Sequence, residues 1–266
     1  MRRLATLALT ALVAGSAAQA LAGQASVEVV ALSLAKKDPD SKFGQSFALG
    51  QRAGTSVNVR IVHEGKTFVK VMDRASKLAA FADDKGTDLT TAEKPRFGMN
   101  RWLARSQVAD DGKSCVVEIR SDAVPASGAT ALALKATIAI RCGSDVQTAE
   151  QKDVALEKGT AITTGPIPMK ITKASKPQWG DAELSITLQS DKSFDAIKSL
   201  AFVDAQGNEI KCRKTGSTRM GFGDQFTYTR EYSLEKKIDK ATLRVEYYGK
   251  TEVLNVPVEA TVGVGL

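Results

Sequence analysis

The sequence predicts an all-β protein in which two β-sandwich domains follow one another after a cleaved signal peptide. Three observations lead to this prediction. Most of the chain alternates apolar and polar residues in short runs, with almost no helical periodicity. One strand–turn–strand pattern occurs twice, at an offset of 121 residues. The first 22 residues have the composition of a secretory signal.

The signal, residues 1–22, begins with two arginines and continues with an apolar run at residues 4–14. Small residues follow in an A-x-A pattern, which places cleavage before Leu21 or Gly23. The apolar run is shorter than the ~20 residues that a membrane-spanning helix needs. We therefore expect an exported protein, periplasmic or extracellular, with no transmembrane span in the mature chain.

The alternating runs predict strands along the whole mature chain, because period-2 alternation is typical of half-buried strands. The first set is Val27 to Leu34, Ser56 to Val62, Phe68 to Met72, Leu78 to Asp83, Cys115 to Arg120 and Ala131 to Arg141. The second set is Ile167 to Lys173, Ala182 to Leu188, Leu200 to Asp204, Glu209 to Arg213, Phe226 to Tyr232, Thr242 to Tyr248 and Glu252 to Val262. We expect the last of these strands to pair inside the second sandwich, with an open edge for another chain as the alternative.

A stretch of small residues with Gly and Pro, Lys158 to Pro166, separates the two sets. It predicts a domain boundary, with domains at 23–160 and 166–266. Thr90 to Gly112 interrupts the strand rhythm of the first domain. We interpret that segment as an insertion or a strand-crossing loop near 90–112.

The repeated pattern aligns Ala80 to Leu89 with Ala201 to Ile210 without a gap. In each copy an apolar strand ends in Asp, and two polar residues, a Gly and a second strand follow. This order predicts a hairpin whose turn glycine has a positive φ. Together with about seven short strands per domain, it indicates immunoglobulin-like sandwiches. The domains resemble the broad class of bacterial immunoglobulin-like and fibronectin-like modules, without the Cys-Trp-Cys spacing of antibody domains.

The sequence lacks the residue patterns of several common catalytic and metal-binding sites. His63 is the single histidine, which excludes a multi-histidine metal cluster and leaves a Ser-His-Asp arrangement one possible base. We expect it in a surface turn. The acidic runs lack the calcium-loop spacing, and turn chemistry accounts for Asp83 and Asp204. We therefore expect no catalytic, cofactor-binding or metal-binding residues.

The chain is mildly basic. The formal charge of +7 falls to +5 when the signal is removed, because 35 basic residues then remain against 30 acidic ones. Gly216 to Gly223 is interpreted as a flexible loop tip, and basic side chains surround it. These candidate polyanion-binding residues are Lys211, Arg213, Lys214 and Arg219. The basic residues lack aromatic interleaving, so we expect no nucleic-acid partner.

Three cysteines in an exported chain allow one disulfide. Cys115 opens one predicted strand and Cys142 ends another, so a hairpin near Gly128 brings them into rough opposition and predicts a Cys115–Cys142 disulfide. Cys212 remains, either as a buried, inert thiol or as part of an intermolecular disulfide. Trp102 and Trp179 are candidate aromatic contacts for a sugar, with core packing as the alternative.

These observations predict an exported, non-enzymatic binding or structural module of the bacterial cell envelope. The expected partner is a protein or an anionic envelope polymer, contacted through loops or sheet edges. The alternatives are an envelope hydrolase that uses a carboxylate pair, and an inhibitor or chaperone that acts by strand addition. The sequence leaves the oligomeric state open.

Overall fold

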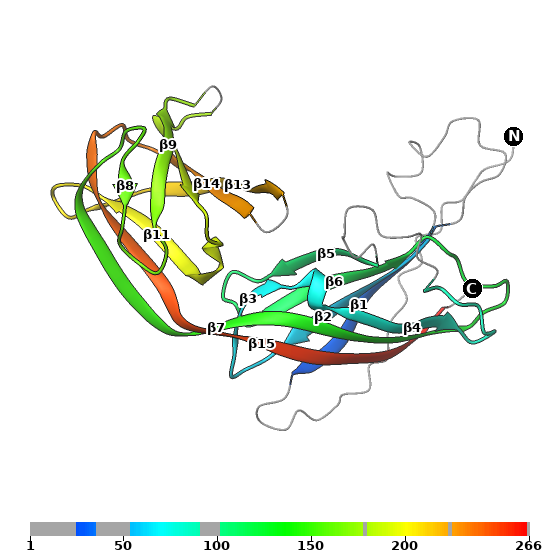
Figure 1. Cartoon of the computed structure of the whole chain (residues 1–266). Helices are drawn as coiled ribbons and strands as arrows, with labels where there is room; N and C mark the ends of the chain where they lie inside the picture. The colour runs from blue at the N-terminus through cyan, green and yellow to red at the C-terminus, as the bar shows by residue number, and fades with distance from the viewer. Residues whose placement is uncertain (1–24, 36–53, 91–101, 178–179, 223–224, 265–266) are drawn as a thin grey trace, which may run out of the picture. The chain divides into compact units, whose positions relative to one another are not determined.

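The computed structural model describes residues 25–35, 54–90, 102–177, 180–222 and 225–264 (Figure 1). Within these ranges the protein is all-β, as predicted, and its strands pair antiparallel. Two short 3-10 turns, η2 (Asp73–Ala75) and η4 (Phe194–Ala196), are the helical elements there. No helix in the described part of the chain is long and apolar enough to cross a membrane. The predicted signal lies outside the described residues.

Most strands begin and end near their predicted positions. They are β1 (Ser26–Ala35), β2 (Gly54–Val62), β3 (Thr67–Val71), β4 (Lys77–Asp83), β5 (Leu103–Val108), β6 (Ser114–Ser121), β7 (Ala131–Ala155), β8 (Ala161–Ile162), β9 (Met169–Ser175), β10 (Leu184–Ser190), β11 (Ile197–Val203), β12 (Glu209–Ile210), β13 (Cys212–Phe222), β14 (Gln225–Leu234) and β15 (Lys240–Gly263). The strands β7 and β15 are much longer than predicted.

The chain divides into two compact units. The first unit is Met1–Cys142 with Glu252–Leu266, and the second unit is Gly143–Thr251. This division differs from the predicted boundary, because Lys158 to Pro166 lies within the second unit. The chain passes between the units inside β7 and β15, which pair with each other (Figure 1). A change of unit inside a continuous strand leaves no Gly- or Pro-rich signal.

The first unit encloses its core between two sheets. One sheet has the order β1-β2-β6-β5, and in the other β7 pairs with β3 and β4 on one side and with β15 on the other. Fully buried side chains from both sheets meet in one cluster, among them Val59, Phe81, Val117, Ile138 and Val258. The alternation of such residues with polar ones in each strand made these strands predictable.

The second unit repeats this plan. Its sheet β9-β10-β14-β13, extended by β8, has the same order as β1-β2-β6-β5, and its other sheet has the order β12-β11-β15-β7. The core again collects fully buried side chains from both sheets, such as Ile171, Ile186, Phe202, Leu234 and Val245. Each unit therefore has a sandwich-like arrangement of two antiparallel sheets around its own core.

The repeated hairpin has the same geometry in both units, which confirms the prediction. In the first unit, Asp83 Oδ1 accepts hydrogen bonds from the backbone N–H groups of Lys85 at 2.9 Å and Thr87 at 2.8 Å. In the second unit, Asp204 Oδ1 accepts the equivalent bonds at 3.0 and 2.8 Å. The turn glycines have φ values of 86° and 85°, a region that glycine adopts without strain.

The C-terminal strand contradicts the prediction that it pairs inside the second sandwich. The half of β15 from Glu252 onward belongs to the first unit, and Val256, Val258 and Val262 are buried in that unit's core. Lys66 forms an ion pair with Glu252, and Lys135 forms one with Glu259 at 2.7 Å. The alternation of apolar and polar residues in a sequence indicates which face of a strand is buried, but not which sheet the strand joins.

Two other segments also differ from expectation. Part of the predicted insertion, Leu103–Val108, is strand β5 at the edge of a sheet, where most of its side chains are exposed. The predicted loop Gly216 to Gly223 is strand up to Phe222. Both strands are exposed on two faces, so they lack the alternation by which strands are recognised in a sequence.

Candidate binding surface

The hairpin β13–β14 belongs to the second unit (Figure 1). Its end carries the most exposed large apolar side chains among the described residues. Phe222 is 95% exposed and Met220 is 68% exposed. Met220 pairs with Thr227 and Phe222 with Gln225, so both apolar side chains stand on one face of the hairpin beside small or polar neighbours. Nothing apolar in the described hairpin covers them.

The other face of the hairpin end is held by aromatic contacts. The Arg219 guanidinium lies 3.7 Å from the centre of the Phe226 ring and 5.8 Å from that of Tyr228, which are cation–π distances. The Phe226 ring also lies over Gly221. A Cβ atom at Gly221 would stand 2.1 Å from the backbone oxygen of Gln225 and 2.7 Å from Phe226 Cδ1, so glycine is required at this position.

Three of the four predicted polyanion-binding residues lie on β13 and Lys211 directly precedes it, but the four do not form one cluster. Lys211 forms an ion pair with Glu235 at 2.5 Å, and Arg219 stacks on Phe226. The register places Lys214 opposite Tyr232 and Arg213 opposite Ser233, which puts these two exposed cations on opposite faces. The basic residues therefore surround the strand instead of converging on one ligand.

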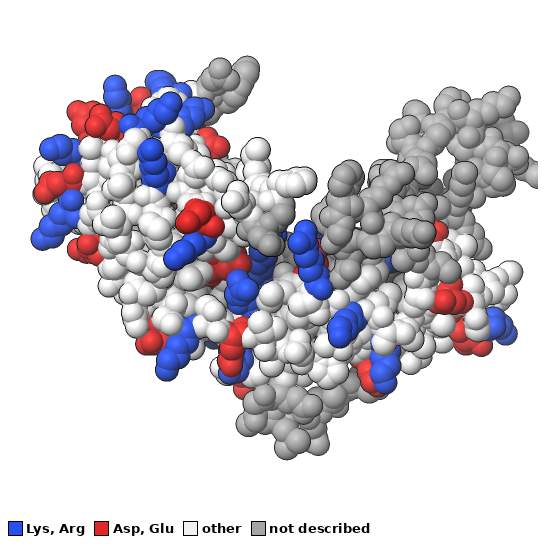
Figure 2. All heavy atoms as spheres, in the orientation of Figure 1, with Lys and Arg blue, Asp and Glu red and all other residues white. Residues whose placement is uncertain are grey.

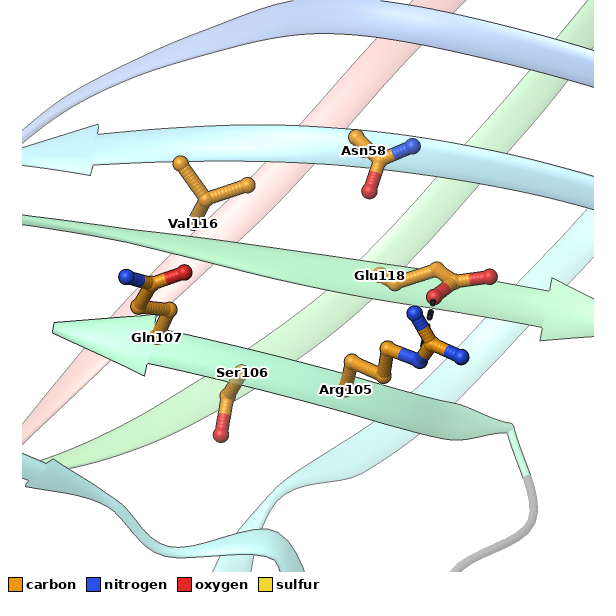
Figure 3. A pocket seen from close by; sticks show the side chains of 6 residues that line it. All are labelled: Asn58, Arg105, Ser106, Gln107, Val116 and Glu118. Atoms are coloured by element: carbon orange, nitrogen blue, oxygen red, sulfur yellow. Dashed lines mark ion pairs between the residues drawn. The ribbon is translucent and has the colours of Figure 1, made fainter. Parts of the chain in front are cut away.

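A shallow polar hollow of about 450 Å³ lies on the outer face of the first unit's sheet β1-β2-β6-β5 (Figure 3). Its lining consists of Asn58, Arg105, Ser106, Gln107, Val116 and Glu118. Glu118 Oε2 lies 3.9 Å from Nε of Arg105, and Glu118 Oε1 accepts a hydrogen bond from the Ser56 hydroxyl at 3.0 Å. Glu118 is the single carboxylate in this lining, so the hollow does not supply the carboxylate pair of a glycoside hydrolase.

The predicted Cys115–Cys142 disulfide is not formed, and Cys115, Cys142 and Cys212 are free thiols. Cys115 lies on β6 and Cys142 on β7, in the two different sheets of the first unit, rather than on two arms of one hairpin. Both side chains are buried in that unit's core. Burial raises the pKa of the Cys115 thiol to about 12, which makes it a poor nucleophile.

Cys212 is half-buried, and its Sγ lies 3.8 Å from the backbone oxygen of Leu200. Burial raises the pKa of this thiol above its ordinary value.

His63 is in a turn, as predicted, but it is buried, which contradicts the surface position. Its Nδ1 accepts a hydrogen bond from the Gly65 backbone N–H at 3.1 Å, and its own backbone N–H donates to Lys113 at 3.2 Å. These bonds satisfy polar groups inside a loop. Trp102 is half-buried against the first unit's core, a packing position. Trp179 lies outside the described residues.

Asp83 and Asp204 hold the turns of the repeated hairpin. The side chain of Asp83 is buried and also accepts a hydrogen bond from the Ala126 N–H at 2.7 Å. Burial opposes the charge of Asp83, but its backbone hydrogen bonds outweigh burial and lower its pKa. For Asp204, the Asn208 backbone N–H is the main cause of a lowered pKa. Nowhere in these ranges do three or more His, Cys, Asp or Glu side chains gather as a metal site would require.

Charges of both signs are interspersed over the face shown in Figure 2. The hairpin end differs by its apolar side chains. Sequence reasoning missed Met220 and Phe222 because the glycines around them indicated a loop. It placed Phe226 at the start of a strand but did not connect it with the binding surface. The available signal was the placement of Met220 and Phe222 two residues apart, a spacing that puts both side chains on one face of a strand.

No protein-family model, no curated protein and no solved structure matches this chain.

Proposed function

We propose that this protein is an exported, non-enzymatic binding module of the bacterial cell envelope, built from two immunoglobulin-like sandwiches, and that it contacts a partner protein through the hairpin β13–β14. The main observation behind this proposal is the exposure of Phe222 and Met220 at the end of that hairpin. When a partner covers large apolar side chains that were exposed to water, the free energy of the complex falls.

The composition of the hairpin end supports a protein partner. Aromatic residues, Met and Arg are enriched where proteins bind one another, and Phe222, Met220 and Arg219 lie within four residues of each other. The stacking of Arg219 on Phe226 and the fit of that ring over Gly221 order the end of the hairpin before a partner arrives. A pre-ordered surface loses less conformational entropy on binding.

Export and the immunoglobulin-like class rest on further support. The first 22 residues match a secretory signal. Each unit has two antiparallel sheets around one core, and the shared order β1-β2-β6-β5 and β9-β10-β14-β13 relates the units to each other. Sandwiches of this class commonly bind partners through loops and strand ends on a rigid scaffold.

Site-specific photo-crosslinking tests this function. A photoreactive amino acid replaces Phe222 in cells that produce the protein, and mass spectrometry identifies what it captures. The matched control replaces Val146, which is 49% exposed on β7 of the same unit. We expect a discrete crosslinked protein from position 222 and none from position 146. Equal capture at both positions, or none at position 222, would contradict the proposal.

A further inference from the structure

We propose, on the basis of the function above, that the partner adds an extended segment as a new antiparallel or parallel strand along the free edge of β13, and that this segment alternates apolar and acidic side chains. Pairing at a sheet edge would give the affinity, and the side chains of β13 would select the sequence. The proposal thus specifies both the binding mode and the chemistry of the partner.

The edge is available over a defined length. Among the described strands, β13 pairs with β14 alone, so its other side presents backbone N–H and C=O groups without a strand partner. Most β13 side chains are exposed on both faces. A register shift between Lys214 and Gly216 interrupts the ladder, and from Gly216 to Phe222 the register is continuous. At 3.3 Å per residue, this uninterrupted edge is about 23 Å long.

The side chains of this edge define the segment that fits it. Met220 and Phe222 lie on one face, so apolar residues at every second position of the added strand would pack against them. Arg219 lies on the opposite face, where an acidic residue of the added strand would form an ion pair. The apolar and the acidic positions required of the added strand therefore alternate, as the side chains of a strand alternate between its two faces.

Charge also selects the occupant. β13 contains Arg213, Lys214 and Arg219, and no acidic residue. Two copies of this strand placed edge to edge would bring cations together, and like charges facing each other destabilise strand pairing. Cations on an edge strand commonly discourage self-association in this way. An acidic segment experiences attraction at the same edge, so the charge favours a different chain over a second copy.

A synthetic peptide tests the binding mode without the natural partner. The probe is a capped octapeptide, Val-Glu-Val-Glu-Phe-Glu-Val-Thr, titrated into ¹⁵N-labelled chain that lacks the predicted signal. We expect chemical-shift changes and slowed amide exchange confined to β13 and its neighbour β14. N-methylation of alternate peptide residues along one edge should abolish binding, whereas N-methylation along the other edge should leave it intact.

Substitutions in the protein test the side-chain demands. Phe222→Ser should weaken the peptide at least about tenfold, because it removes the burial of a large apolar side chain. Val146→Ser, at an exposed valine elsewhere in the unit, should leave the affinity unchanged. Arg219→Glu should weaken the acidic probe and strengthen a version in which Lys replaces Glu. A probe of the same composition with the apolar and acidic residues in two blocks should not bind.

The outcomes separate this inference from the proposed function. If position 222 captures a protein in cells but N-methylation along either edge leaves peptide binding intact, strand addition is wrong and the binding module stands. Sedimentation that shows a dimer abolished by Phe222→Ser would make a second copy the occupant and would overturn the inference. Capture of lipid at position 222 would overturn both proposals, as would capture of nothing.

Discussion

Val258→Ala tests the assignment of the C-terminal strand to the first unit. Val258 is fully buried in that unit's core, although it follows the whole second unit in the chain. The substitution removes two methyl groups from a closed site, which costs about 1.5 to 3 kcal/mol when the lost burial and the cavity are counted together. The loss should appear in the first unit.

Hydrogen exchange read by peptide provides the measurement. In the amides of β2 and β4 that exchange through unfolding of the first unit, a loss of this size raises the exchange rate roughly ten- to hundredfold. Peptides from β10 and β11, in the second unit, should keep their rates. Trp102 fluorescence during urea unfolding, in a Trp179→Phe background that leaves one tryptophan, gives a second readout from the first unit.

Val253→Ala is the matched control, because Val253 lies on the same strand but is 48% exposed. Its cost should stay below about 0.5 kcal/mol. The assignment would be refuted if both substitutions had equal effects, or if Val258→Ala accelerated exchange in β10 and β11 while β2 and β4 were unchanged. Deleting residues 252–266 removes four buried valines, roughly 6 to 12 kcal/mol, which matches the whole stability of a typical domain. That deletion should unfold the first unit.

Three further predictions follow from the thiols, the turns and the hairpin. Iodoacetamide should label none of the three cysteines rapidly in the native, unreduced chain at pH 8, because the thiols are buried or half-buried and burial raises the pKa of Cys115 to about 12. After denaturation it should label all three cysteines. Labelling of only one cysteine after denaturation would indicate a disulfide. Asp83→Ala should destabilise the protein more than Asp204→Ala, because Asp83 also holds the Ala126 N–H. Both carboxyl groups have a lowered pKa in the folded protein, so each stabilises the fold above the unfolded-state pKa near 4 and loses this effect as the pH falls below that value. Urea midpoints of the two variants that lie equally far below that of the unsubstituted protein at pH 3 and at pH 7 would contradict this. Gly221→Ala should disorder the end of β13–β14 in amide spectra, whereas Gly216→Ala, whose Cβ meets only the Glu231 side chain at 3.3 Å or more, should leave it intact.

Strands with one buried face were predictable from the sequence. β2 and β10 alternate clearly because each is an inner strand of its sheet, with one face on a core. The hairpin turns were equally clear, since Asp and Gly at fixed spacing have a local mechanism. In both cases the physical cause acts within a few residues, so the sequence contains all of it.

Edge strands were harder to predict. β5 and β13 lie at the ends of their sheets and expose both faces, so their side chains carry no alternation imposed by burial. In β13 the glycines indicated a loop, whereas Gly221 in fact makes room for the Phe226 ring of the neighbouring strand. That requirement depends on the strand that lies alongside, and the candidate surface was missed for this reason.

The sequence by itself determined the all-β class and the repeated hairpin, because side-chain periodicity and turn chemistry act locally. Only the tertiary structure decided which unit contains the C-terminal strand, that the three cysteines lie in three different sheets, and where apolar side chains remain exposed. Each of these depends on the neighbour that a strand acquires across a long stretch of chain. Val258 alternates in the same way whichever sheet it joins, so its partner is a property of the assembled fold.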